Sequence, residues 1–236
     1  HGQQVNMDLH EPLWQSVLNL MGQSADPLML NGEVMTQTAN IKRAQEKGDR
    51  LEVSNIYFWC LILAGLFGEH KLAVEMAEKS SLIVVKVLSG YANTRYAFFQ
   101  GLSAIGMAWQ ARTNKLKARW KKLAKSNIIK LEKYDRLKSG NREYMILLLK
   151  AEYAAIKSDQ VKALQAYDAA IKLAKDNKFL QDEGLSCEKA ALFLIKHERI
   201  DEATQYMDRA VSCYSSWGAH AKVDQLKLLH PSLVPS

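Results

Sequence analysis

The stretch AEYAAIKSDQVKALQAYDAAIKLA, residues 151–174, returns in a related form as ALFLIKHERIDEATQYMDRAVSCY, residues 191–214. The two copies start forty residues apart, and in each an alanine occupies three of four matched positions. A small side chain at such a position lets two helix backbones approach without a clash, so the repeat predicts packed helix pairs. The matched positions are Ala151, Ala163, Tyr167 and Ala170 in the first copy and Ala191, Ala203, Met207 and Ala210 in the second.

The internal spacing of this repeat matches the tetratricopeptide (TPR) pattern, although forty residues exceed the TPR length of about 34. A weaker copy, FGEHKLAVEMAEKSS at 67–81, places Ala73, Ala77 and Ser80 at the positions of Ala163, Tyr167 and Ala170. We therefore predict an all-α fold, a TPR-like α-solenoid of antiparallel helix pairs that bury their faces by stacking on their neighbours.

The helical period continues outside the repeats, and no segment shows the alternation typical of a strand. There is no proline between Leu28 and His230, which favours long helices. Breaks are predicted at Gly48-Asp49, Gly68, Ser89-Gly90, Ser139-Gly140, Ser158-Asp159 and Gly218. The predicted helices are Glu11–Met21, Glu33–Glu46, Leu51–Phe67, His70–Leu88, Arg95–Arg112, Leu116–Leu137, Arg142–Lys157, Gln160–Asn177, Asp182–His197, Ile200–Ser216 and Ala219–Leu229.

We expect four parts along the chain. These are a helical lead-in at 1–48, degenerate TPR-like helix pairs at 49–140, two clear repeats at 141–218, and a capping helix with a tail at 219–236. The first residue is histidine rather than methionine, which favours a segment of a longer protein.

In the cap, Gly218 can take a positive φ and end the preceding helix, with Trp217 packed over the break. The helical spacing then predicts that Lys222 lies on the exposed side of the last helix, whereas Val223, Leu226 and Leu229 face inward. Pro231 is predicted to end that helix.

Positive charge is concentrated in one segment. Residues 112–138 hold eleven lysines and arginines and two acids, a net charge of +9, whereas the whole chain carries +7. Apolar residues Leu116, Trp120, Leu123, Leu131 and Tyr134 recur there at helical spacing. The segment therefore predicts either a solvated helix face or a surface for an acidic partner.

Other features favour structural roles. The run IYFWCLILAGLF, residues 56–67, is too short to cross a bilayer and predicts a core helix. The cysteines Cys60, Cys187 and Cys213 are far apart, which predicts buried free thiols in a reducing compartment. We find no nucleotide-binding, zinc-protease or serine-hydrolase motif. No catalytic, cofactor-binding or metal-ligating residue is therefore assigned, and we expect a non-enzymatic segment that needs no cofactor.

Several stretches in a fixed order resemble a known family: EPLWQSVLNLMG, PLMLNGEVM, YAFFQGLSAI, LLLKAEYAAI, AYDAAIKLAKDNKF, EGLSCEKAALFLI and YSSWGAHAKVDQL. Together they cover almost the whole chain and are similar to the TPR-like helical region of large hybrid sensor histidine kinases. Those kinases carry a protein-kinase-like domain and a STAND-type ATPase before this region, and a GAF domain and a histidine-kinase core after it. The most specific piece is the closing W-G-A-x-A-K at 217–222. One departure is the loop at Ser139-Gly140, where the family often has a proline.

The resemblance implies a cytoplasmic, non-catalytic interaction module that relays the state of a partner to the kinase. The partner would be another protein or a neighbouring domain of the same chain. Two alternatives stay open: a small-molecule sensor of the STAND type, and a binder of nucleic acid or an anionic surface through 112–138. The lack of aromatic residues alternating with the basic ones disfavours nucleic acid. The candidate interaction residues are Lys115, Arg119, Lys122, Lys125, Trp217 and Lys222.

Overall fold

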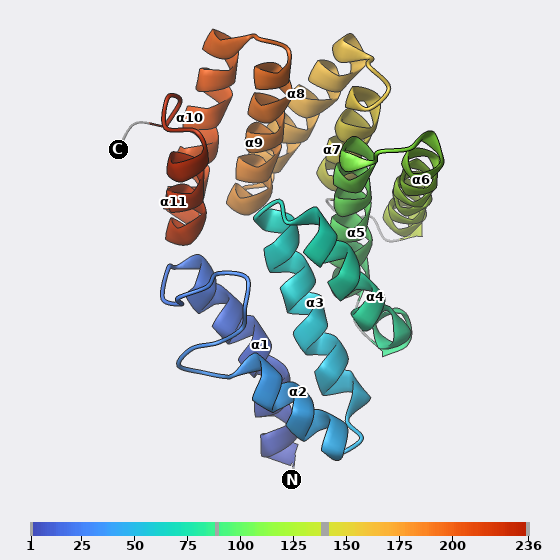
Figure 1. Cartoon of the computed structure of the whole chain (residues 1–236), viewed down its shortest axis with the longest axis vertical. Coiled ribbons are helices and arrows are strands. Elements are labelled where there is room, and N and C mark those ends of the chain that lie inside the picture. Colours follow the sequence, from blue (N-terminus) through green and yellow to red (C-terminus); the bar gives the residue numbers. More distant parts are fainter. Residues whose placement is uncertain (1, 88–89, 138–141, 235–236) are drawn as a thin grey trace. The chain divides into compact units, whose positions relative to one another are not determined.

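The computed structural model describes residues 2–87, 90–137 and 142–234, with side chains placed at 10–80, 90, 92–136 and 142–234. In these ranges the chain forms eleven α-helices and no strand, and Asn31 and Thr36 form an isolated antiparallel bridge. Figure 1 labels the helices along the chain. The all-α prediction is confirmed. The helices are α1 Gly2–Leu20, α2 Gln37–Glu46, α3 Arg50–Leu66, α4 His70–Val87, α5 Gly90–Gln110, α6 Asn114–Leu137, α7 Glu143–Ala155, α8 Gln160–Asp176, α9 Leu180–Lys196, α10 Ile200–Trp217 and α11 His220–Leu229.

The chain divides into two compact units, His1–Ser103 and Ala104–Ser236, with the boundary inside α5. In the first unit α3 packs against α1, α2 and α4. In the second unit α7 packs along α8, α9 along α10, and α8 against α9, while α6 lies on α7 and α11 on α10. From α6 to α11, each helix thus packs against the next one along the chain, as the short connections predict.

One turn geometry recurs where consecutive helices join. A residue one to three positions beyond the helix end has a left-handed φ between 60° and 85°; these residues are Gly48, Gly68, Ser158, Lys178, Glu198 and Gly218. The N–H of each donates to the carbonyl three residues back, and the next N–H donates to the carbonyl five residues back, the paired bonds of a Schellman motif. The positions 158, 178, 198 and 218 are equally spaced, so each helix with its turn takes twenty residues and each pair takes forty.

The small residues of the repeat are buried as predicted. Ala151, Ala163, Ala170 and Ala203 have no exposed surface, and Tyr167 has 1%. The weaker copy behaves alike, since Ala73, Ala77 and Ser80 are also fully buried. The predicted core run is confirmed at Ile56, Leu63 and Phe67, whereas Trp59 is partly exposed.

Three helix starts differ from the prediction by more than two residues. Helix α1 begins at Gly2 instead of Glu11 and contains Pro12, while α5 begins at Gly90 instead of Arg95. Helix α2 begins at Gln37 instead of Glu33 because the preceding residues form a loop fastened to α1. The side chain of Gln15 accepts a hydrogen bond from the Val34 N–H at 3.0 Å, a contact that no local pattern encodes. The predicted breaks at Ser89 and at Ser139-Gly140 lie outside the described residues.

Candidate interaction site

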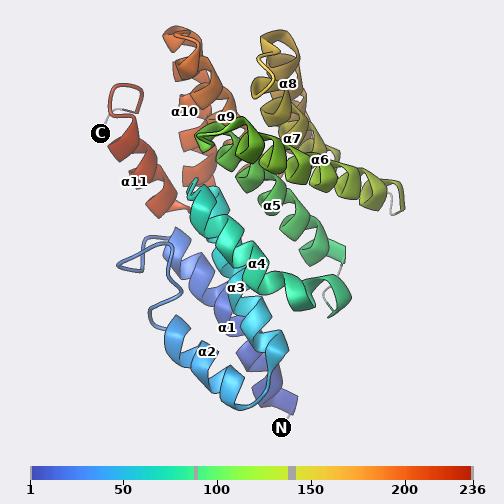
Figure 2. The ribbon, with the colours of Figure 1, turned by 45° about the vertical axis from the view of Figure 1, so that its right-hand side comes forward.

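Helix α6 has one buried face within the second unit and a broad basic face exposed to solvent. Its buried residues are Ala124, Asn127, Ile128 and Leu131, which follow the spacing of one helix face. Of the apolar residues that recur there at helical spacing, Leu131 is buried, whereas Leu116 is 43% exposed and Trp120 is partly exposed. The helix lies against α7 (Figure 2).

A groove of about 450 Å³ runs along α6 beside α7. Lys117, Lys121 and Lys125 follow one another at intervals of four residues, so they form a row along the helix. A parallel row is formed by Asn114, Ala118 and Lys122, and α7 contributes Tyr153. The groove therefore carries four ammonium groups, one amide and one phenol.

The positive charges in this groove are not neutralised within the described part of the chain. None of its four lysines has a carboxylate within ion-pair distance there. Glu132, one of the two acids of the basic segment, is paired with Lys150 of α7 at 2.8 Å.

Two further lysines add charge near the groove. The Nζ of Lys157 lies 5.1 Å from the ring centroid of Tyr153. The Nζ of Lys196 lies over the Trp109 ring, where burial and then the positive charge of Lys117 lower its pKa. The charge of Glu152 opposes this shift without cancelling it.

The predicted residues of α6 are all exposed, but they do not all contribute to the groove. Lys122 and Lys125 line it, whereas Lys115 and Arg119 do not, and the Arg119 guanidinium lies over the Trp120 ring at 5.4 Å. Lys117, Lys121 and Tyr153 were not among the interaction residues predicted from the sequence. The four-residue spacing of Lys117, Lys121 and Lys125 is a signal that could have identified Lys117 and Lys121. It could not have identified Tyr153, which lies on another helix.

The cap prediction is wrong for Lys222. This residue is 1% exposed, and its Nζ donates to Glu188 Oε1 and to Gln225 Oε1, both at 2.8 Å. Lys222 faces inward because the Glu188 carboxylate of α9 provides a counter-charge for its ammonium group on that side of α11. Leu229, expected to face inward, is 58% exposed instead.

Other features of the cap agree with prediction. Gly218 has a φ of 85° and ends α10, and Val223 and Leu226 are buried. Trp217, at the last position of α10, is 36% exposed. It therefore offers part of its ring to solvent, next to the turn into α11.

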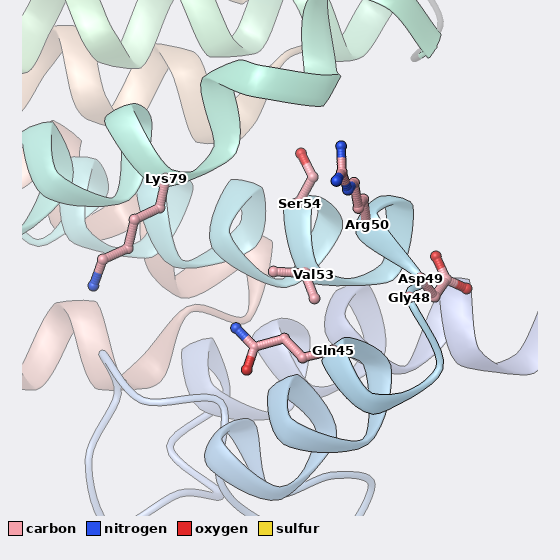
Figure 3. Close-up of a pocket in the computed structure, with 7 residues that line it drawn as sticks. All are labelled: Gln45, Gly48, Asp49, Arg50, Val53, Ser54 and Lys79. Atoms are coloured by element: carbon pink, nitrogen blue, oxygen red, sulfur yellow. The ribbon is translucent and has the colours of Figure 1, made fainter.

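The first unit holds a separate groove of about 650 Å³ between α2, α3 and α4 (Figure 3). Val53 is its one apolar lining side chain, and three of its polar side chains have structural partners. Asp49 caps α3, Ser54 donates to the Ser80 carbonyl, and Lys79 pairs with Glu75 at 2.6 Å. This groove has no aromatic side chain in its lining, whereas a pocket for a drug-sized ligand is lined predominantly by apolar and aromatic side chains. Its remaining lining residues are Gln45, Gly48 and Arg50.

Metal-binding clusters and membrane-spanning helices are both absent from the same described ranges. No cluster of three or more His, Cys, Asp or Glu side chains there could hold a metal ion. No helix there combines the length and the apolar character needed to span a bilayer. The three cysteines are buried and unpaired, as predicted.

Comparison with known proteins finds a similarity over part of the chain. No protein-family model matches it, and no solved structure matches it significantly. It is similar to the hybrid signal transduction histidine kinase G of Dictyostelium discoideum, with 34% identity over 113 residues. The match covers 48% of this chain and 3% of that kinase, so the chain corresponds to a small part of that protein.

Proposed function

We propose that this chain is a non-catalytic interaction and regulatory module of a multidomain histidine kinase. The observation that carries the proposal is the similarity to a hybrid histidine kinase over 113 residues. In this proposal the module binds a protein partner, or a neighbouring domain of the same kinase, in the cytoplasm and passes that state to the kinase core.

We also propose that the helices form a TPR-like solenoid. Support comes from the forty-residue period of the turns and from the pairing of α7 with α8 and of α9 with α10. Repeated pairs of this kind give extended surfaces suited to binding other proteins. The small terminal helix α11, with its buried ion pair, would close the stack and serve as a cap.

The decisive experiment uses the complete kinase that contains this segment. Phosphoryl transfer to its histidine is measured with and without residues 1–236 and in the Trp217→Ala variant. We expect removal to change the level or the responsiveness of phosphorylation while the chemistry persists, because the catalytic groups lie elsewhere. Unchanged output after removal would contradict a regulatory role, and phosphorylation by the isolated chain would contradict a non-catalytic one.

Trp217→Ala tests whether the cap also transmits the signal. If Trp217 acts at the joint, its removal alters output at a temperature where the variant is still folded. An effect on the melting temperature alone would restrict Trp217 to a structural role. Exposed Val161, at the start of α8, offers a control as Val161→Ala.

A further inference from the structure

The basic groove has the geometry of a binding site for a row of carboxylates. In an α-helix, residues four apart are separated by about 6 Å along the axis. In an extended peptide, every second side chain faces the same way, at intervals of about 6.6 Å. Lys117, Lys121 and Lys125 could therefore each meet one acid of an acid–x–acid–x–acid segment.

We propose that the groove between α6 and α7 binds an extended acidic segment of a partner protein. The proposal deepens the proposed function, on which it rests, by naming one binding surface of the module and the chemistry of its partner. The lysine row would contact successive carboxylates, while Asn114 and Tyr153 would donate hydrogen bonds to the same segment.

Charge balance within the chain supports an external partner. The segment 112–138 carries +9 and the rest of the chain −2, so the chain has no comparable excess of acid to offer. Glu132 is held by Lys150, and Asp135 lies more than two helical turns beyond Lys125. An arriving acidic segment would therefore relieve the repulsion that Lys117 exerts on Lys196.

The composition of the groove favours a protein over nucleic acid. Its cations are lysines, whereas arginine is the usual choice for paired contacts to phosphates and bases. Single-strand binders also need several free aromatic faces, and the groove has Tyr153, whose ring already has Lys157 nearby.

The groove also lacks the apolar side chains that insert into a membrane surface. Between its lysines stands Ala118, not the Leu, Phe or Trp of an interfacial helix. The exposed apolar residues Leu116 and Ile129 are not part of its lining.

The test compares two triple variants of equal charge. Lys117→Gln/Lys121→Gln/Lys125→Gln changes the groove, and Lys115→Gln/Lys130→Gln/Lys133→Gln changes other positions of the same helix. The probe is a fluorescent peptide with glutamate at every second position, titrated at low and high salt. We expect the groove variant to weaken binding about ten-fold and to flatten its salt dependence, with a loss below about three-fold in the control.

Several outcomes would overturn the proposal. Equal losses in both variants would mean non-specific attraction to a basic helix. Tighter, groove-dependent binding of a mixed-sequence DNA duplex would identify a nucleic-acid site instead, and the same result with phosphatidylserine vesicles would identify a membrane site. If circular dichroism shows that the groove variant does not fold, the triple variant with arginine in place of Lys117, Lys121 and Lys125 provides the test. Because this variant keeps the three positive charges, the proposal requires it to bind the peptide.

The two proposals can fail separately. If the groove does not bind the acidic peptide, the regulatory role is still tested separately, by histidine phosphorylation in the complete kinase. An unchanged phosphorylation level with intact peptide binding would instead remove the signalling role and keep the acidic-segment site.

Discussion

Lys222 of α11 donates a 2.8 Å hydrogen bond to Glu188 of α9, and both side chains are at most 5% exposed. Tyr214 of α10 donates to the other carboxylate oxygen at 2.7 Å. Burial alone would raise the pKa of Glu188, but Lys222, Lys189 and the two hydrogen bonds outweigh it and lower that pKa. Burial acts on Lys222 as well and lowers its pKa, whereas Glu188 opposes this shift. With two acceptors at 2.8 Å, the geometry is that of an ammonium group, and the pair joins three helices at the end of the chain.

Removing one partner of this pair should strongly destabilise the second unit. We expect Lys222→Met to lower the free energy of unfolding by about 3–5 kcal/mol, because it leaves the Glu188 carboxylate buried without its counter-charge. Urea denaturation followed by circular dichroism measures the loss. Lys227→Met on the same helix serves as the control, and the double variant Glu188→Gln/Lys222→Met should lose less than the sum of the two single variants. A loss below about 1 kcal/mol for Lys222→Met would show that the pair is not a major source of stability.

Glu152 and Glu188 should respond to pH with opposite signs. Each accepts a hydrogen bond from a tyrosine, Tyr167 at 2.6 Å and Tyr214 at 2.7 Å, but Glu152 has no ion-pair partner within 4 Å in the described residues. Burial therefore dominates and raises the pKa of Glu152 above its usual 4.5. Its contribution to stability is present below pH 4.5 and is lost as the pH rises through the folded-state pKa. The lowered pKa of Glu188 gives a contribution that is present above pH 4.5 and is lost on acidification.

The corresponding variants provide the measurement. We expect the change in melting temperature caused by Glu152→Gln to be more favourable at pH 7 than at pH 4. Glutamine can still accept the Tyr167 hydrogen bond, so this bond is not lost in the variant. Glu188→Gln should lower it more at pH 7 than at pH 4. Melting curves between pH 4 and pH 8 check both signs, and parallel shifts across this range in either variant would contradict the assignment.

Glycine should be favourable at three turns that now hold other residues. Ser158, Lys178 and Glu198 have φ values of 60° to 62°, in the left-handed region that costs an L-residue about 1–2 kcal/mol. Part of this gain is offset by the extra freedom of glycine in the unfolded chain, so each change to glycine should stabilise by up to about 1 kcal/mol. Thermal or urea denaturation of each single variant measures the gain, and destabilisation at all three positions would contradict the turn geometry.

The reverse change supplies the control. Gly218 has a φ of 85°, and an added Cβ would meet nothing within 4 Å. Any loss of stability in Gly218→Ala therefore reports backbone strain rather than a clash, and we expect about 1–2 kcal/mol. A neutral substitution would show that α10 ends without a left-handed residue.

The thiols should be inert in the folded protein. Burial raises the pKa of Cys60 to about 12, that of Cys187 to about 12 and that of Cys213 to about 11. Because the thiolate is the reactive form, an aromatic disulfide reagent at pH 8 should modify these residues only as fast as the chain opens. Three thiols should react at once in denaturant. Rapid modification under native conditions would contradict their burial.

Much of the local structure could be predicted because it depends on neighbouring residues. The turn at Gly218 and the buried alanines at 163, 170 and 203 follow from residue size and helical period alone. The turn at Lys178 was not predicted. Its left-handed residue is not a glycine, so it carries no compositional signal, and the forty-residue interval to Gly218 is the one clue that the sequence offers.

The sequence by itself determined the number and order of the helices, the short turns and the small residues where helices meet, because each depends on contacts within about one helical turn. The tertiary structure decided the environment of individual charges. Lys222 lies on the inner side of α11 because Glu188, 34 residues earlier, is brought there by the packing of α9, α10 and α11. The groove likewise needs Tyr153 of α7 beside the lysines of α6. Whether a charged residue faces water or a counter-charge depends on helices distant in the chain, which the period of one helix does not encode.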